Sequence, residues 1–229
     1  STKYKLNLRT IGSGGEALGE DLLEWGKRIL GVNINEFYGQ TECNLTISNS
    51  SAIMPTKQGS IGKPVPGQEV RIMNKRGEFI KESGVDGEIV VNYNTPVAFL
   101  KYWENDKETQ NKVINGWLHT GDFAFRDDEG YFYFKGRKDD LINSSGYRIG
   151  PTEIENTILS LQEVEMVAVV GVPDELRGEI IKAVIVPREK SLLKNKNEKL
   201  KDKIKEHVKQ SLAAHEMSLI HISEPTRLR

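Results

Sequence analysis

The apolar pattern at the start of the chain alternates and then changes to a helical spacing. In KLNLRTIGSGGEAL, apolar residues at Leu6, Leu8 and Ile11 precede a run of glycines, which predicts a strand that ends in a tight loop. The segment 18–30 has the spacing of an amphipathic helix, and VNINEFYG at 32–39 predicts a second short strand. Strand, helix, strand is the parallel α/β pattern, which places ligand-binding loops at strand ends.

From residue 60 to residue 136 the pattern changes to short strands separated by turns. The strand-like runs are GQEVRIMN, GEIVVNY and GYFYFKG, with Pro or Gly between them. Such closely spaced runs predict a small antiparallel sheet or a barrel-like subdomain.

A charged segment at 137–140, Arg-Lys-Asp-Asp, precedes a third pattern. Gly150-Pro151 followed by Glu153 predicts a helix start, because Pro suits the first helical position and acids suit the first turn. VEMVAVVGV and EIIKAVIVP predict apolar strands, and residues 195–214 predict a Lys/Glu-rich amphipathic surface helix. The predicted fold class is therefore α/β, then a β-rich subdomain, then an α+β C-terminal domain.

Composition narrows the class of protein. The 229 residues are 37% hydrophobic and 28% charged, with a net charge of −1, so electrostatics give no case for binding nucleic acid or an anionic membrane. No apolar run is long enough to span a bilayer. Cys43 is the single cysteine, which excludes an internal disulfide and favours a reducing compartment.

Two loops carry candidate nucleotide chemistry. In GSGGEAL, residues 12–18, glycines let backbone amides approach an anionic or flat ligand, although a plain tight turn explains the same letters. In EFYGQTE, residues 36–42, Tyr38 offers a face for a base, Thr41 a donor to phosphate and Glu42 a ligand for Mg²⁺. The alternative for this second loop is a turn that caps a helix.

The stretch GWLHTGDFAFRDDEGYFYFKGRKDDLINSSGYRIG adds further candidates. Asp122 lies among apolar neighbours, so its carboxylate needs donors, either two vicinal ribose hydroxyls or the backbone amides of its own turn. Arg137 suits phosphate or ribose oxygens, with a surface ion pair as the alternative. Ser144-Ser145-Gly146 predicts a polar hairpin tip, and His119 a packed or hydrogen-bonded histidine.

Taken in order, these motifs resemble those of adenylate-forming acyl-CoA synthetases. The resemblance covers about Leu6 to Glu216 and is carried by GSGGEAL, YGQTE, IGKPVPGQEVRI, GEIVV, GWLHTGD and GRKDDLINSSGYRIGPTEIE. INSSGYRIGPTEIEN and VVGVPDELRGEIIKAVIV are similar to the medium-chain branch, with acetyl-CoA synthetases as the nearest competitor. Other adenylating enzymes (peptide synthetase domains and aryl-CoA ligases) and a non-catalytic AMP-binding module stay open as alternatives.

The resemblance implies a two-step ligase. A carboxylic acid attacks the α-phosphate of ATP to give acyl-AMP and pyrophosphate, and the thiol of coenzyme A then displaces AMP. It implies ATP or AMP, Mg²⁺ and coenzyme A as ligands, a medium-chain or branched fatty acid as substrate, and a cytoplasmic or mitochondrial-matrix location. It implies neither nucleic acid nor an integral membrane segment, and it leaves the oligomeric state open.

The resemblance also assigns roles to residues of this chain. Those implied to bind nucleotide are Gly15, Glu16, Ala17, Glu36, Tyr38, Gly39, Thr41, Asp122 and Arg137. Those implied to act on the phosphate are Thr41, Glu42, which also binds Mg²⁺, and Arg148. Asp139 is the implied hinge, and the implied coenzyme A tunnel is formed by Ser145, Gly146 and Tyr147. Acetate-using relatives carry a bulky aromatic at the place of Gly39, so glycine here implies room for a longer acyl chain.

The same resemblance sets domain boundaries. Residues 1–59 are expected to end a truncated N-terminal α/β domain, 60–136 to form the β-rich subdomain, 137–140 the hinge and 141–216 the mobile C-terminal domain. The family's phosphate loop is expected before residue 1. No lysine follows Lys209, where the family has a catalytic one, and MSLIHISEPTRLR at 217–229 is expected to be foreign. We therefore expect the isolated chain not to form acyl-AMP.

Overall fold

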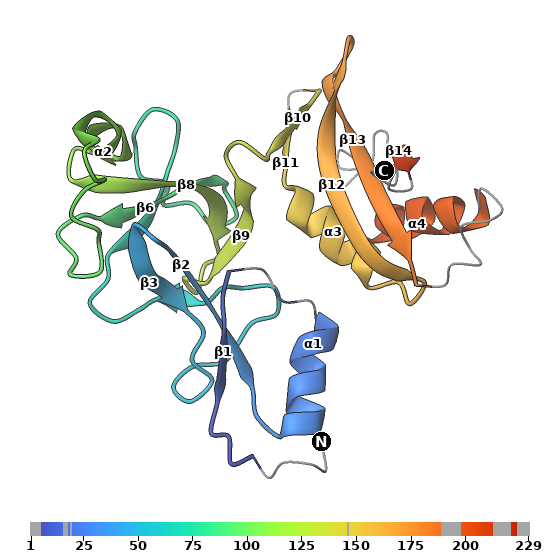
Figure 1. Ribbon diagram of the computed structural model, residues 1–229, viewed down its shortest axis with the longest axis horizontal. Helices are drawn as coiled ribbons and strands as arrows, with labels where there is room; N and C mark the ends of the chain where they lie inside the picture. Colours follow the sequence, from blue (N-terminus) through green and yellow to red (C-terminus); the bar gives the residue numbers. More distant parts are fainter. Residues whose placement is uncertain are drawn as a thin grey trace. The chain divides into compact units, whose positions relative to one another are not determined.

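The computed structural model describes residues 6–15, 18, 20–145, 147–188, 198–212 and 221–223 (Figure 1). The chain divides into two compact units, Ser1–Phe134 and Lys135–Arg229. Each unit has its own buried apolar cluster. Within the described residues, no helix combines the length and apolar character needed to cross a membrane.

The first sheet of unit 1 has the strand order β1-β2-β3-β4. Strand β2 (Ile34–Gln40) pairs in parallel with β1 (Ile11–Ser13) and antiparallel with β3 (Cys43–Ser48), which continues to β4 (Lys63–Pro64). Helix α1 (Glu20–Trp25) and the π-helical turn η1 (Gly26–Leu30) connect β1 to β2. The strand–helix–strand prediction is thus confirmed for this part.

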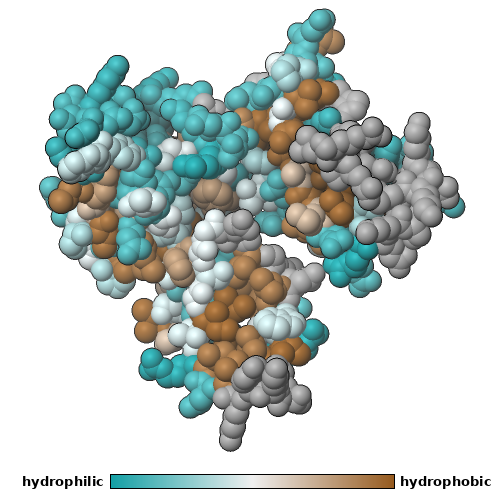
Figure 2. Space-filling view, viewed as in Figure 1, coloured by the Kyte–Doolittle hydropathy of each residue, from teal (hydrophilic) through white to brown (hydrophobic). Residues whose placement is uncertain are grey.

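The predicted first strand was too long. Its pairing with β2 begins only at Ile11, and residues 6–10 are not in a strand. Leu6 is 62% exposed and Leu8 is 38% exposed, so the apolar alternation there has no packed face within the described residues. Leu22, Trp25 and Ile29 of α1 and η1 are also exposed, and Figure 2 shows hydrophobic surface gathered over this part of unit 1. Such a patch is typical of a surface that contacts further polypeptide.

The second sheet of unit 1 contains the three short strands that the sequence predicted, as β5, β6 and β9, together with β7 and the longer β8, which it did not predict. Its order is β5-β6-β8-β7, with β9 paired to β8. The strands are β5 (Val70–Met73), β6 (Gly87–Asn92), β7 (Val113–Ile114), β8 (Trp117–Arg126) and β9 (Phe132–Arg137). Helix α2 (Asp106–Lys112) precedes β7, and the Asn105 side chain caps it by accepting from the backbone amide of Glu108. Ile89, Leu118 and Phe132 lie in the buried cluster under this sheet.

Unit 2 is an α+β domain. Its sheet has the order β11-β10-β13-β12, with β14 paired in parallel to β13. The strands are β10 (Ile142–Ser144), β11 (Tyr147–Ile149), β12 (Val164–Asp174), β13 (Gly178–Pro187) and β14 (His221–Ser223). Helices α3 (Pro151–Leu159) and α4 (Glu198–Ser211) share one core with β12 and β13, in which Ile154, Ile158, Ile204 and Val208 are fully buried.

Two predictions about unit 2 can be compared with this structure. Gly150 is the N-cap of α3 and Pro151 its first helical residue, as the sequence predicted. The helix predicted at 195–214 is present as α4, and the ends of the predicted range lie outside the described residues. In the segment expected to be foreign, His221–Ser223 form β14; residues 217–220 and 224–229 are outside the described part of the chain.

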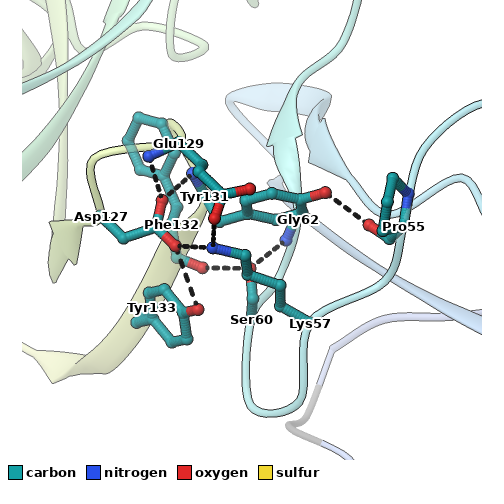
Figure 3. A network of polar contacts seen from close by, with 9 residues as sticks. All are labelled: Pro55, Lys57, Ser60, Gly62, Asp127, Glu129, Tyr131, Phe132 and Tyr133. Carbon is teal, nitrogen blue, oxygen red and sulfur yellow. Dashed lines mark hydrogen bonds and ion pairs between the residues drawn. The ribbon is translucent and has the colours of Figure 1, made fainter.

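A polar network ties the loop between β3 and β4 to the β8–β9 turn (Figure 3). Lys57 Nζ is 2.6 Å from Asp127 Oδ2 and 2.9 Å from Glu129 Oε1. The Tyr131 hydroxyl donates to the Pro55 carbonyl at 2.5 Å, and the Ser60 hydroxyl donates to the Phe132 carbonyl at 2.9 Å. These bonds join residues that are 70 or more positions apart in sequence.

Replacing Lys57 with methionine should destabilise unit 1 slightly, and only where Asp127 is ionised. Burial raises the pKa of the Asp127 carboxyl, but bonds from Lys57 and from the Tyr131 backbone amide outweigh burial, so its pKa lies below the ordinary 3.8. A carboxyl with a lowered folded-state pKa stabilises the protein above its unfolded-state value and loses that contribution as the pH falls through the folded-state value. The stability difference between wild type and Lys57→Met, measured by urea unfolding, should therefore be present near neutral pH and vanish toward about pH 2. A difference that grows on acidification would contradict this.

Candidate functional site

Asp122 is a buried carboxylate within β8. Its residue is 5% exposed, and Oδ2 accepts hydrogen bonds from the Tyr38 hydroxyl at 2.6 Å and from Gln40 Nε2 at 2.5 Å. Both donors come from β2, 84 and 82 positions earlier. Because a buried carboxylate needs such donors, Asp122 is tied to a distant strand and not to its own turn alone.

A bulge in the β6–β8 pairing sets the position of Asp122. Glu88 pairs with Phe123 and Val90 pairs with His119, so the register shifts between them. The residues of β8 inside this shift are Thr120, Gly121 and Asp122, and Gly121 has φ +76°. Bulges redirect side chains and are common beside functional sites. The Thr-Gly-Asp order therefore has a local structural reason.

Glu88 on β6 and Thr120 on β8 fix this bulge by side-chain hydrogen bonds to the backbone of the facing strand. Glu88 Oε1 accepts from the Gly121 backbone amide at 2.9 Å, and Oε2 lies 3.0 Å from His119 Nδ1. The Thr120 hydroxyl donates to the Ile89 carbonyl at 2.7 Å and accepts from the Asp122 amide at 3.1 Å. His119 is a hydrogen-bonded histidine, as the sequence predicted.

Tyr38 is largely covered and acts as a donor. Its residue is 9% exposed and belongs to the apolar cluster of unit 1, with the Phe134 ring centroid 6.3 Å away. Burial, together with the Asp122 carboxylate, raises the pKa of the Tyr38 phenol well above its usual range. The hydroxyl therefore stays protonated at neutral pH, where it donates to Asp122.

Thr41 and Glu42 form the turn between β2 and β3. Glu42 Oε1 accepts from the Tyr102 hydroxyl at 2.5 Å, and burial, together with this bond, raises the pKa of Tyr102 to about 12. Within the described residues, no group of three or more His, Cys, Asp or Glu side chains could hold a metal ion. Glu42 would thus share any Mg²⁺ with oxygens from a ligand or water, as Mg²⁺ sites often do.

Glu36 lies on β2 and is 6% exposed. Its Oε1 accepts from the Leu18 backbone amide at 2.9 Å, and burial raises the pKa of its carboxyl while that amide opposes the rise. It borders a pocket of ≈ 240 Å³ whose other lining residues are Leu23, Glu24, Lys27, Asn33, Ile34, Asn49, Thr56, Lys57 and Gln58. Gly15, in the preceding loop, has φ +99°; Glu16 and Ala17 lie outside the described residues.

The structure gives Gly39 a second reason to be glycine. The pairing of β2 with β3 shifts register between Tyr38 and Gln40, and Leu45 opposite has φ +42°. A Cβ atom on Gly39 would lie 2.4 Å from the Leu45 nitrogen and 2.9 Å from the Cys43 carbonyl oxygen. Close approach of the β3 backbone thus requires glycine whatever the acyl substrate is.

The remaining predicted site residues belong to unit 2. Arg137 is the exposed last residue of β9, and Asp139 is exposed in the turn that follows it. Ser145 at the β10–β11 tip has φ +50° and donates its amide to the Arg177 carbonyl at 2.9 Å. Tyr147 is 54% exposed. Gly146 and the side chain of Arg148 lie outside the described part. Asp122 belongs to unit 1 and Arg137 to unit 2, so their approach stays a prediction.

Four residues around Asp122 were not among the predicted site residues. Gln40 bonds to the Asp122 carboxylate, and Glu88 bonds to the Gly121 amide. Tyr102 bonds to Glu42, and Lys112 Nζ donates to the Thr120 carbonyl at 3.0 Å. Gln40 had one sequence signal, because it lies two positions from Tyr38 and therefore on the same face of a strand. Nothing local marks the other three.

Comparison with known proteins gives the class to which this chain belongs. The family described as AMP-binding enzyme matches residues 2–103, and its C-terminal domain matches residues 153–223. The chain belongs to the AMP-binding enzyme family, and the predicted fold class is confirmed by solved members of it.

Individual relatives point to acyl-CoA ligases. The mitochondrial acyl-coenzyme A synthetase ACSM3 of Rattus norvegicus is 38% identical over 218 residues, which cover 93% of this chain and 37% of the relative. The acetyl-coenzyme A synthetase of Bacillus subtilis is 36% identical over 217 residues, which cover 94% of this chain and 37% of the relative. The solved anthranilate CoA ligase AuaEII, in complex with anthranoyl-AMP, is 31% identical with a TM-score of 0.82, over 94% of this chain and 41% of that one. The chain thus spans little more than a third of the length of these curated relatives.

Proposed function

We propose that this chain is the nucleotide-clamping and lid portion of an AMP-forming acyl-CoA synthetase. The whole reaction joins a carboxylic acid to coenzyme A through acyl-AMP, with release of pyrophosphate and AMP. Membership of the AMP-binding family supports the ligase class. The observation that carries the proposal is the buried Asp122 carboxylate with two donors from β2 on its Oδ2 atom.

The chemistry of Asp122 suits a ribose. A carboxylate accepts hydrogen bonds only, and two vicinal hydroxyls are donors that a buried carboxylate binds well because charge-assisted bonds are strong. We assign Asp122 to the ribose hydroxyls, Tyr38 to the adenine face, and Glu36 to the same nucleotide pocket with the glycine loop at Gly15. Thr41 would donate to the α-phosphate, and Glu42 would hold Mg²⁺ beside it.

Unit 2 would supply the movable part. We assign Asp139 to the hinge, because a hinge needs a few backbone positions at a domain junction. Arg137 would contact ribose or phosphate oxygens, and Arg148 would be a phosphate-side cation. Ser145, Gly146 and Tyr147 would line the path of the coenzyme A thiol. Bound at Glu42, Mg²⁺ would neutralise phosphate charge.

The acid substrate is a medium-chain or branched fatty acid in this proposal. The resemblance of ACSM3 over 93% of the chain supports it. Acetate is the second candidate, favoured by the similar match to the acetyl-coenzyme A synthetase of Bacillus subtilis. We place the enzyme in the cytoplasm or the mitochondrial matrix.

Asp122→Ala should weaken AMP binding to the chain at least about tenfold, because the ribose hydroxyls lose a charged acceptor whose bonds contribute roughly 1.5–3 kcal/mol. The measurement is calorimetric titration with AMP. Asp128→Ala is the matched control, because Asp128 is an exposed aspartate in the nearby β8–β9 turn. Equal AMP affinity for wild type and Asp122→Ala would overturn the proposed function.

A further inference from the structure

The side-chain amide of Gln40 faces two groups that can only accept hydrogen bonds. Nε2 is 2.5 Å from Asp122 Oδ2 and 2.9 Å from the Thr120 carbonyl oxygen. The NH₂ end must therefore point at both, since a flipped amide would put its oxygen against two acceptors. Within the described residues, Oε1 is buried with no hydrogen-bond partner, which costs roughly 1–3 kcal/mol. The contacts of Nε2 thus determine the orientation of this amide.

The same contacts join three elements at one point. The Tyr38 hydroxyl donates to the Asp122 oxygen that Gln40 also contacts, at 2.6 Å. Lys112, at the end of α2, donates to the carbonyl of Thr120 that Gln40 also contacts, at 3.0 Å. Gln40 is the one residue among these that bonds both to the carboxylate and to the backbone of its bulge. It therefore controls the rotation of the carboxylate relative to β8.

We propose that Gln40 is a positioning residue that aims the Asp122 carboxylate at the vicinal hydroxyls of a ribose. This inference rests on the proposed function and adds that selection for a diol depends on the Gln40 NH₂ group. A donor on Oδ2 from each of two neighbouring side chains fixes which edge of the carboxylate meets the sugar. Without Gln40, Oδ2 would lose one of these two donors.

The variant that tests the NH₂ group most directly is Gln40→Glu, which exchanges that group for oxygen with almost no change in shape. The probes are AMP and 2′,3′-dideoxy-AMP, titrated by calorimetry near neutral pH. Wild type should prefer AMP; if it shows no preference, the proposed function itself fails. If wild type prefers AMP, Gln40→Glu should lose at least about tenfold in AMP affinity, because two carboxylates would repel, and should change by less than about threefold for the dideoxy nucleotide.

A pH series separates positioning from general damage. Protonation of one of two adjacent carboxyls would restore a donor between residues 40 and 122, so the AMP affinity of Gln40→Glu should recover toward that of wild type as the pH is lowered. The titratable groups that face the side chain of residue 40 are Asp122 on β8, Tyr38 on β2 and Lys112 on α2. Cys43, on the neighbouring strand β3, is paired with residue 40. Wild type measured at the same pH corrects for titration of the nucleotide phosphate.

Two further variants keep the test decisive. Gln40→Met is uncharged and has no donor, so it should also lose the preference for AMP but show no recovery in acid. Gln110→Glu makes the same chemical change on an exposed part of α2 and should behave as wild type. Tryptophan fluorescence confirms that each variant is folded. If folded Gln40→Glu and Gln40→Met both keep the wild-type ratio of AMP to dideoxy-AMP affinity, Gln40 does not position Asp122.

Discussion

Gly62→Ala should destabilise unit 1 by a large part of the stability of a natural domain. Gly62 has φ +99°, and a Cβ atom there would lie 2.1 Å from the carbonyl carbon and oxygen of Ser48 and 2.3 Å from the Asn49 nitrogen. All three atoms are backbone atoms of the end of β3, so no side-chain rotation relieves the overlap. Strained backbone costs roughly 1–2 kcal/mol and overpacking roughly 1–3, which together predict a loss of about 2–5 kcal/mol. Natural domains have only about 5–15 kcal/mol in total.

The position of Gly62 explains why no neighbour can move. Its carbonyl accepts from the Phe132 amide at 2.8 Å and its own amide donates to the Ser60 hydroxyl at 2.9 Å, so the residue is bonded on the side away from β3. Gly67→Ala is the control, because Gly67 has φ +89° with nothing within 4 Å of a Cβ atom. The three tryptophans, Trp25, Trp103 and Trp117, all belong to unit 1, so their fluorescence in urea reports on this unit. If Gly62→Ala and Gly67→Ala lose the same free energy of unfolding, the predicted overlap of a Cβ atom at position 62 with the Ser48 backbone does not occur.

Gly39→Ala should cost unit 1 about 2–3 kcal/mol, because its Cβ atom would overlap the backbone of Cys43 and Leu45. Gly171→Ala on β12 is the control, since its Cβ atom would meet only the end of the Glu179 side chain, which can move. Circular dichroism during urea unfolding follows both variants.

This result also separates two reasons for glycine at position 39. If Gly39 only makes room for an acyl chain, alanine would leave stability unchanged and would weaken binding of a hexanoyl-AMP mimic more than that of an acetyl-AMP mimic. Close packing against β3 predicts a loss of stability for the free chain. An aromatic residue at this place would then need a different path for residues 43–45.

The helices and strands that the sequence predicted well are those set by residues close together in the chain. Pro151 begins α3 because proline suits the first turn, and the short strands of the second sheet follow runs bounded by glycine and proline. The strand predicted over Leu6 and Leu8 was too long, since alternation alone does not supply a partner strand.

The assignment of the site residues stays a prediction, and the sequence did not name the donors that the structure gives Asp122. Asp122 could be chosen because a carboxylate among apolar residues needs donors, and the structure supplies them from Tyr38 and Gln40. The pairing itself spans more than 80 positions and depends on a bulge in the β6–β8 register, which no local pattern encodes. The steric reason for Gly39 also depends on the path of β3, which became visible only in the folded chain.

The most direct measurement is a crystal structure of the chain with AMP. We predict both ribose hydroxyl oxygens within about 3.2 Å of the Asp122 carboxylate, with Gln40 Nε2 still bonded to Oδ2. AMP held elsewhere in unit 1, for example between Lys27 and Lys57 in the pocket beside α1, with its ribose away from Asp122, would contradict the assignment of this carboxylate as the ribose clamp.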